Sequence, residues 1–437
     1  MEVKSTKKSY WHYMYFLIGQ QFSMLGSMIV GFVITWWMAG NVIFLSISVF
    51  LMFLPQIIVT PLSGVLSDRW NKKAIIAISD SGQAAATLLL FVFFLFDIQN
   101  IVFVLAINTF RAALFAFQLP AVQSLVPIMI PKKSLSRVNG MNFLSTGVIF
   151  TMGPMIAAGL MAIFPQTELI FLLDIITFLI AMVPLLIIKI PKVHQTTEEA
   201  VKKSMFKDFK TGLLTIKMIP GLFAMIAFAM VWNFINRPWA VLLPNFIYDT
   251  HGGTALNLAL LMTVSQVGNI IGSLITSLKK TWKHKIKINI IGGAIFFVCQ
   301  IPAILAPQGN FIIMMISLFP AWVIFPITVS TYLAILQTVV SKDKIGRIMS
   351  IDHMISMAIA PIGALISGPL ALLIGIRYLF LIAAILGVIH PFIIWGFTKI
   401  RQLEVIEREI VMKADEVAEV EEITELTEVI QVIEPIE

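Results

Sequence analysis

The sequence predicts an all-α polytopic membrane protein whose twelve transmembrane helices form two pseudo-symmetric six-helix bundles. Hydrophobic residues make up 58% of the chain, with 33 Phe and 23 Met, and the mean hydropathy is +0.92. These values lie far above those of a soluble domain, which could not bury so much apolar surface. Apolar runs of helix length recur along the chain, and basic residues cluster in every second connection between them.

The individual spans are marked by apolar runs of about 20 residues, the length that crosses the hydrocarbon core of a bilayer as a helix. The longest polar connection separates two sets of such runs. The first set lies near residues 13–38, 43–66, 74–96, 100–121, 138–163 and 168–190. The second set lies near residues 218–248, 255–278, 286–306, 311–339, 348–373 and 377–398.

The connections alternate between basic and uncharged. Basic residues precede the first span and recur around 69–73, 131–137, 189–217, 279–287 and 342–347, whereas the intervening turns carry none until Arg377. Cytoplasmic loops carry the excess of Lys and Arg in membrane proteins. The pattern predicts a multi-pass protein of the cell (plasma) membrane with both its N- and C-termini in the cytoplasm.

The two halves look like repeats on either side of a cytoplasmic linker at 191–217. Basic residues, an aliphatic residue, a small residue and then Arg137 follow the fourth span, and the same order ends at Arg347 after the tenth. We therefore expect six-helix bundles at 1–190 and 218–400. Duplicated halves with a site near the midplane are typical of alternating-access transporters.

Residues 401–437 form a separate acidic tail. They contain twelve acidic and three basic residues, a net charge of −9, which leaves residues 1–400 with 28 basic and 12 acidic residues, a net charge of +16. Apolar residues recur at helical spacing, which predicts an acidic amphipathic cytoplasmic helix that binds a basic partner or self-associates. A solvated tail is the alternative interpretation. The basic excess elsewhere follows the topology and does not indicate nucleic acid.

The connection between spans two and three carries the sharpest motif, Gly64-Val-Leu-Ser-Asp-Arg-Trp-Asn-Lys-Lys73. It resembles the signature of the major facilitator superfamily at the same place in the topology. Asn71 replaces the usual Gly, and Asn tolerates the same left-handed turn. The resemblance implies that this loop stabilises one transport state and that Asp68 pairs with Arg137. The conformational residues that it implies are Gly64, Asp68, Arg69, Lys72, Lys73, Arg137 and Arg347.

Two further resemblances concern the first and fifth spans. Gly153-Pro154 with small neighbours is similar to the Gly-Pro motif of antiporters in this superfamily, where small residues permit close helix contact and proline bends the helix. The stretch Gly19–Ser27 resembles the first helix of macrolide-efflux-type permeases. This second resemblance implies drug export in exchange for protons.

Ionisable residues inside spans are costly and are functional candidates by default. Arg111 lies near mid-membrane in span four, with Asn108, Phe115 and Gln118 on the same helix face. This face is predicted to line a central cavity, although Arg111 could instead pin the helix through hydrogen bonds. The resemblance to the superfamily implies a role for this Arg in proton coupling.

Three carboxylates lie deep enough in spans to exchange a proton, namely Asp80, Asp174 and Asp352. For each of them, a structural hydrogen-bonding role remains the alternative. Arg237-Pro238, placed near the outer end of span seven, suggests a bent helix at an external gate. The other predicted cavity residues are polar or aromatic side chains within spans: Gln20, Gln21, Trp232, Asn233, Gln266 and Asn269.

No nucleotide-binding loop occurs, the His residues lack metal-ligand spacing, and the chain contains one Cys. We expect no cofactor, no metal and no enzymatic activity. The sequence predicts a transporter that exports small lipophilic compounds in exchange for protons. The alternatives are a lipid, lysolipid or siderophore permease of the same fold, and a non-transporting membrane scaffold or sensor that acts through its tail.

Overall fold

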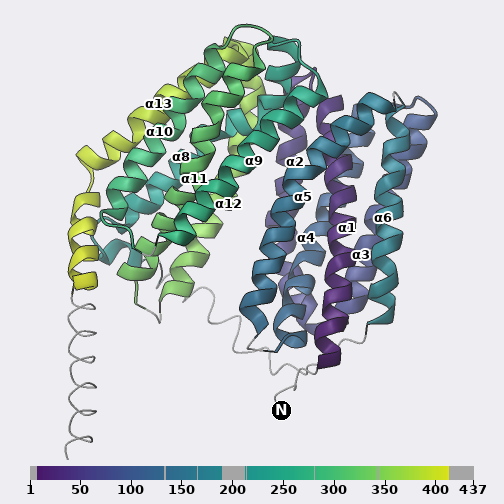
Figure 1. Cartoon of the computed structure of the whole chain (residues 1–437), viewed down its shortest axis with the longest axis horizontal. Coiled ribbons are helices and arrows are strands. Elements are labelled where there is room, and N and C mark those ends of the chain that lie inside the picture. The colour runs from purple at the N-terminus through teal and green to yellow at the C-terminus, as the bar shows by residue number, and fades with distance from the viewer. Residues whose placement is uncertain are drawn as a thin grey trace, which may run out of the picture.

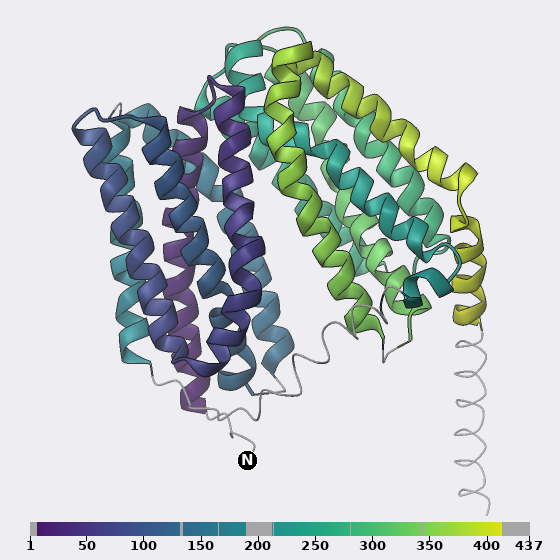
Figure 2. The same cartoon turned by 180° about the vertical axis from the view of Figure 1, so that it is seen from behind.

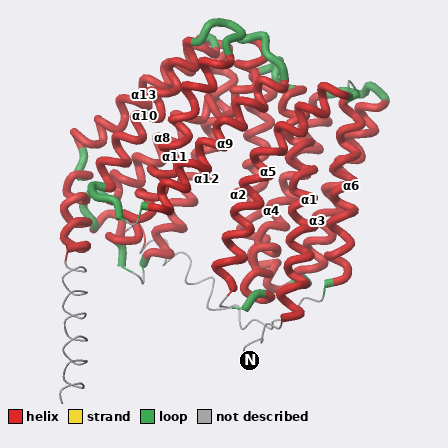
Figure 3. Tube along the Cα trace, viewed as in Figure 1, coloured by secondary structure: helices red, strands yellow, loops and turns green. Residues whose placement is uncertain are grey.

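The computed structural model describes residues 7–131, 134–164, 166–188, 212, 214–279, 281–341 and 344–412. Within these residues the chain is helical apart from its connections and contains no strand. Twelve of the described helices are long and apolar enough to cross a membrane. The predicted fold class is confirmed, and Figure 3 shows that the loops lie at the two ends of the helices.

The first half forms one group of six helices (Figure 1). Asn71 and Asn100 cap the amino ends of the third and fourth helices, where their side chains accept hydrogen bonds from free backbone N–H groups. The helices are α1 (Lys7–Trp37), α2 (Val42–Arg69), α3 (Lys72–Leu95), α4 (Ile101–Met129), α5 (Leu135–Ile163) and α6 (Thr167–Ile187).

The second half repeats this arrangement. Its first helix continues into a π-helical turn, and prolines interrupt several helices without ending them, as membrane helices tolerate. The elements are α8 (Leu222–Asn245), η2 (Phe246–Thr250), α9 (Ala255–Leu278), α10 (Lys285–Leu305), α11 (Phe311–Val339), α12 (Ile345–Ile374) and α13 (Ile376–Phe397).

The two groups meet at one end only. We call the end where α1 begins the basic end and the end where α1 finishes the opposite end. Contacts between the groups join α2 to α12 and α8, and α5 to α9. At the opposite end, Asn245 Nδ2 donates to Ala39 O at 2.6 Å, and the rings of Trp36 and Tyr248 lie 5.6 Å apart.

The hydrophobic cores follow the same division. One core, which includes Val33, Phe171, Trp239 and Phe380, draws residues from both groups and lies at the opposite end. At the basic end each group has its own separate core. The two groups therefore pack together at the opposite end and part toward the basic end, as Figures 1 and 2 show.

The tail begins with a helix that docks on the second group. Residues 400–412 are helical, and Leu403, Glu404 and Glu407 are buried. Glu407 accepts a hydrogen bond from Lys285 Nζ at 2.5 Å, and Glu404 lies 3.3 Å from His284 Nδ1. The basic connection between α9 and α10 thus contacts acidic residues of the chain's own tail. Residues 413–437 lie outside the described part.

The connection between α2 and α3 departs from the prediction at Asn71. This residue has φ −65° and ψ 110°, an extended conformation, and its side chain accepts a hydrogen bond from Lys73 N. The predicted left-handed turn was wrong, because Asn serves here as a helix cap instead. Lys73 Nζ donates to the carbonyls of Leu186 and Ile188, at the carboxyl end of α6.

Candidate functional site

A network of buried polar side chains lies inside the first group, between α1, α3, α4 and α6. Its members repeat at a spacing of seven residues on three helices: Gln20 and Ser27, Asp80 and Thr87, Arg111 and Gln118. Seven residues are two helical turns, about 10.5 Å, so each helix contributes one residue to each of two layers.

The layer nearer the basic end is built around Asp80. Gln20 Nε2 donates to Asp80 Oδ2 at 2.9 Å, and Gln118 Nε2 donates to Asp80 Oδ1 at 2.8 Å. Asp80 is 5% exposed and lies eight residues into α3, about 12 Å from its start. Both oxygens of this buried carboxyl group are therefore held by neutral amides.

The second layer is built around Asp174. Arg111 NH2 lies 3.0 Å from Asp174 Oδ2, and the two side chains are almost fully buried. Thr87 Oγ1 donates to the same oxygen at 2.6 Å, and Ser27 Oγ donates to Asp174 Oδ1 at 3.0 Å. The ion pair links α4 to α6, with hydroxyl groups from α1 and α3 filling the remaining positions around the carboxylate.

Gln83 and Thr87 follow Asp80 along α3. Gln83 Nε2 donates to Gln118 Oε1 at 3.0 Å, and the Gln83 backbone carbonyl lies 3.1 Å from Thr87 Oγ1. Side-chain hydrogen bonds thus join Gln20, Asp80, Gln118 and Gln83 around the first carboxyl group, and Thr87 belongs to the second. The two layers are neighbours along α3, but no unbroken chain of side-chain hydrogen bonds joins them, because Thr87 contacts only the backbone carbonyl of Gln83.

Close contact between α1 and α6 positions the second layer. A Cβ atom added to Gly26 would lie 2.1 Å from Thr177 Oγ1 and 2.9 Å from the Cα atom of Asp174. Only glycine leaves room for α6 there, and the adjacent Ser27 can then reach the carboxylate. The Gly19–Ser27 stretch of the sequence motif therefore has a local packing reason in α1.

The two carboxylates differ in how their charge is balanced. Asp174 is neutralised by Arg111, whereas Asp80 has no basic partner in the described part of the chain. An ion pair buried in this way resists the loss of either partner. A carboxyl group held by amides alone can bind a proton without breaking an ion pair.

The predicted face of α4 is divided in the structure. Arg111 and Gln118 point into the network, while Phe115 is 41% exposed and Asn108 is half-buried. Gln21, on α1, is half-buried, and its Oε1 has no hydrogen-bond partner. The structure thus unites Gln20, Asp80, Arg111, Gln118 and Asp174, and it leaves the other three outside the network.

Asp352 lies apart from this network in the second group. It sits seven residues into α12, and Tyr332 Oη of α11 donates to its Oδ1 at 2.6 Å. The structure therefore does not bring Asp352 together with Asp80 and Asp174.

The predicted cavity residues of the second group lie in different surroundings. Trp232 packs in a ring cluster with Phe296, Phe297 and Phe325, while Asn233 Nδ2 donates to the backbone carbonyl of Ala229. Gln266 and Asn269 are both half-buried on α9. Their predicted role in a cavity remains a prediction.

Arg237 does not lie near the end of its helix, so the predicted position was wrong. It sits 15 residues into α8, about 22 Å from the start, and 13 residues before the end of η2. Pro238 follows it within continuous helix. The guanidinium carbon lies 5.6 Å from the ring centre of Phe53 on α2, at the junction of the two groups.

The conformational residues are only partly described. The side chains of Gly64, Asp68 and Arg69 lie outside the described part, and so does the predicted pairing of Asp68 with Arg137. Lys72 begins α3, while Arg137 and Arg347 are exposed in the first turns of α5 and α12.

Gly153 and Pro154 are buried in α5. A Cβ atom at Gly153 would lie 3.1 Å from Met28 Cβ, so this glycine lets α5 approach α1 closely.

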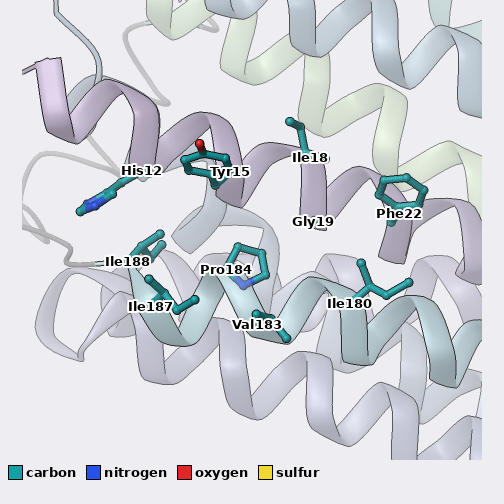
Figure 4. Close-up of a pocket in the computed structure, with 10 residues that line it drawn as sticks. All are labelled: His12, Tyr15, Ile18, Gly19, Phe22, Ile180, Val183, Pro184, Ile187 and Ile188. Carbon is teal, nitrogen blue, oxygen red and sulfur yellow. The ribbon is translucent and has the colours of Figure 1, made fainter.

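An apolar cavity of about 450 Å³ lies between α1 and α6, toward the basic end (Figure 4). Its walls combine exposed side chains of α1, such as Tyr15 and Phe22, with Val183 and Ile187 of α6. None of the five side chains that bind Asp80 and Asp174 lines it. It is separate from the polar network.

Sequence reasoning missed Ser27, Gln83 and Thr87 as members of the site. The signal was present, because Gln83 and Thr87 follow Asp80 by three and seven residues and Ser27 follows Gln20 by seven. Residues at these spacings share a helix face. It also missed Lys285, Glu404 and Glu407, whose contacts depend on where the tail docks.

Residues 16–364 match the Major Facilitator Superfamily, and the chain belongs to this superfamily of membrane transporters. Macrolide efflux protein A of Streptococcus pyogenes is 24% identical over 392 residues, which cover 89% of this chain and 96% of the relative.

Two solved structures share the fold. One is a bacterial homologue of the iron transporter ferroportin in an inward-facing state, with a TM-score of 0.66 and 16% identity over 88% of this chain and 98% of the other. The other is a D-xylose–proton symporter, with a TM-score of 0.66 and 12% identity over 89% of this chain and 97% of the symporter.

Proposed function

We propose that this transporter exports lipophilic compounds, such as macrolides, in exchange for protons, and that it lies in the plasma membrane with its basic end in the cytoplasm. The alternation of basic connections supports this orientation. The relative named as a macrolide efflux protein supports the substrate class, and the D-xylose–proton symporter shows that the fold accommodates proton coupling. In this orientation the parted end of the helices faces the cytoplasm.

The observation that carries the proposal is the buried carboxyl group of Asp80, which only amides bind and which lies two helical turns from the layer of the Asp174–Arg111 pair. A transporter that exchanges protons for substrate needs a carboxyl group that changes protonation state within the membrane. Asp80 is such a group, because it is buried and bound only by amides. Asp80 shares α3 with Thr87, which binds Asp174, so a movement of α3 at Asp80 reaches the ion pair that joins α4 to α6.

Exchange follows from competition between the two ligands. Protonation of Asp80 makes one of its oxygens a donor and leaves the other an acceptor, so one of the two amides of Gln20 and Gln118 must turn its oxygen toward the carboxyl group. A proton and a substrate that prefer different arrangements of these helices each shift the balance between the two transport states. Release of the proton into the cytoplasm then favours the state that binds substrate from that side.

The test is proton-driven uptake of a radiolabelled macrolide into inverted membrane vesicles, with and without a protonophore. We expect uptake that the protonophore abolishes, and we expect Asp80→Asn to lose this gradient-driven uptake. Because the neutral amide mimics the protonated carboxyl group, the variant should retain exchange of labelled for unlabelled macrolide. Loss of both activities in a correctly folded variant would assign Asp80 a structural role instead.

The alternative functions are separated by the same vesicles. Competition by a lysolipid or a siderophore, with no uptake of macrolide, would indicate a permease for those compounds. Removal of residues 413–437 tests the scaffold alternative while it retains the docked helix at 400–412. Transport that is unchanged by this truncation would exclude an essential role for the removed residues.

A further inference from the structure

Arg237 is a second membrane-embedded arginine, and its surroundings differ from those of Arg111. Arg111 pairs with Asp174 within the first group. Arg237 makes no hydrogen bond or ion pair with any residue that the structure describes, and its Nε atom is buried. Arg237 as a whole is half-buried. A charge within a span is costly even when it is partly buried, so an arginine without a counter-charge there indicates a missing partner.

The position of Arg237 places it where the two groups meet. Its guanidinium lies over Phe53 of α2, and its Cβ and Cγ atoms pack against Gly363 of α12. A Cβ atom at Gly363 would lie 2.8 Å from Arg237 Cγ, so glycine is needed for the observed packing. The two groups part from each other toward the basic end. The junction at Arg237 therefore lies on the side of their contact region that faces the basic end.

Neither nearby carboxylate of the described second group can neutralise Arg237. Asp352 is bound by Tyr332 and lies 11 residues before Gly363 on α12, about 16 Å along the helix. Asp249 lies at the opposite end and is bound by Asn245. The ring of Phe53 offers only a cation–π contact at 5.6 Å, which does not neutralise the charge.

We propose that Arg237 binds the anionic group of an amphipathic substrate, a carboxylate or a phosphate attached to an apolar body. The apolar body lies against two half-buried rings. The ring of Phe53 lies beside the guanidinium, and the ring of Phe234 lies beside Gly363. Arginine suits this role because its planar fork donates two parallel hydrogen bonds to carboxylate or phosphate. The assignment rests on the proposed function for its transport path, but binding can be measured without transport.

The test uses three probes that share one apolar body and differ in charge: 2-naphthoate, 2-naphthyl phosphate and 2-naphthylmethylammonium. Isothermal titration calorimetry of the purified full chain in a non-ionic detergent gives the affinity of each. We expect at least one anion to bind about tenfold more tightly than the cation, the gain of one charge-assisted contact. The difference between the two anions identifies carboxylate or phosphate as the preferred group.

Two variants locate the binding to Arg237. Arg237→Gln should lower the affinity for the anion by about 10- to 100-fold and leave that for the cation unchanged. Gly363→Ala keeps the charge but displaces it, so it should weaken anion binding as well. Gly396→Ala is the matched control, because a Cβ atom there meets nothing within 4 Å. Melting curves confirm that each variant is folded.

Three outcomes would overturn the proposal. They are equal affinity of the wild type for the anions and the cation, absence of anion binding at millimolar concentration, and anion binding that survives Arg237→Gln. Anion binding without macrolide uptake in vesicles would support Arg237 as an anion site and contradict the proposed substrate class.

Discussion

Thr87 Oγ1 lies 2.6 Å from Asp174 Oδ2 and 3.1 Å from the backbone carbonyl oxygen of Gln83. A hydroxyl group has one proton and can donate it to only one of these acceptors at a time. The carboxylate that pairs with Arg111 is the stronger acceptor of the two. Thr87 therefore ties α3 to the ion pair between α4 and α6.

Removal of this hydroxyl group should impair coupling without disturbing the packing. Thr87→Val is nearly isosteric and removes one of the two donors to Asp174 Oδ2, which keeps Arg111, so the loss is that of one hydrogen bond to a charged group, about 1.5–3 kcal/mol. We expect proton-driven macrolide uptake to fall about tenfold, since each 1.4 kcal/mol is about a factor of ten. Thr87→Ser keeps the hydroxyl group and should retain uptake. Equal uptake by the two variants would contradict a role for the Thr87 hydroxyl group in proton-driven transport.

The Arg111–Asp174 pair should dominate the stability of the first group. Asp174→Asn leaves the buried Arg111 without its counter-charge, which should cost about 3–5 kcal/mol and lower the apparent melting temperature by roughly 10 °C. Replacement of both residues by apolar side chains, Arg111→Met with Asp174→Leu, removes the unpaired charge. The double variant should therefore melt above the single one in detergent. If it melts lower, the pair is not the dominant interaction.

The docked tail helix should stabilise the second group through its two buried carboxylates. Glu407→Gln removes the ion pair with Lys285, which is partly exposed, so we expect a loss of about 1–3 kcal/mol. Thermal unfolding measures it, with Glu409→Gln as the control because Glu409 is exposed on the same helix. If Glu409→Gln lowers the free energy of unfolding by more than about 0.5 kcal/mol, the effect is not specific to the docked face of the helix.

His251 should make stability depend on pH. It is buried at the opposite end between Phe246 and Phe311, and burial, followed by the charge of Arg377, lowers its pKa. Below the ordinary histidine pKa of about 6.5 the unfolded chain binds more protons than the folded one. Stability from neutral His251 is therefore complete above this pH and is lost as the pH falls.

We expect the melting temperature of the wild type to fall more steeply from pH 7 to pH 5.5 than that of His251→Leu, a range chosen to span the histidine pKa of about 6.5. Leucine cannot titrate, so the difference between the two proteins isolates this group. Parallel curves would show that His251 does not contribute to the pH dependence.

The spans were predictable because charge is costly within a bilayer. The predicted spans 255–278 and 311–339 coincide with α9 and α11, and most other boundaries differ by four residues or fewer. The exceptions are α1, which begins six residues earlier than predicted, and α4, which ends eight residues later. The position of Arg237 was not predictable in the same way. The sequence placed Arg237 at a bend near the outer end of span seven, but the helix continues through Pro238 and Pro244 into η2.

The sequence identified individual residues of the polar network, but it did not predict which of them bind to one another. Burial cost identified Asp80, Arg111 and Asp174 as individual residues, and helical spacing placed Gln118 on the face of Arg111. Arg111 and Asp174 lie 63 residues apart in sequence, and only the packing of α4 against its neighbours brings them to 3.0 Å. The pairing of Lys285 with Glu407 likewise depends on tertiary docking across 122 residues.

The central claim, competition between a proton on Asp80 and a lipophilic substrate, is tested most directly by proton release. A macrolide is added to the purified protein in weakly buffered detergent solution, and the change in pH is recorded with an indicator dye. We predict that the wild type releases protons on binding and that Asp80→Asn binds macrolide without release. Binding to the wild type without release, or equal release from both proteins, would contradict the account.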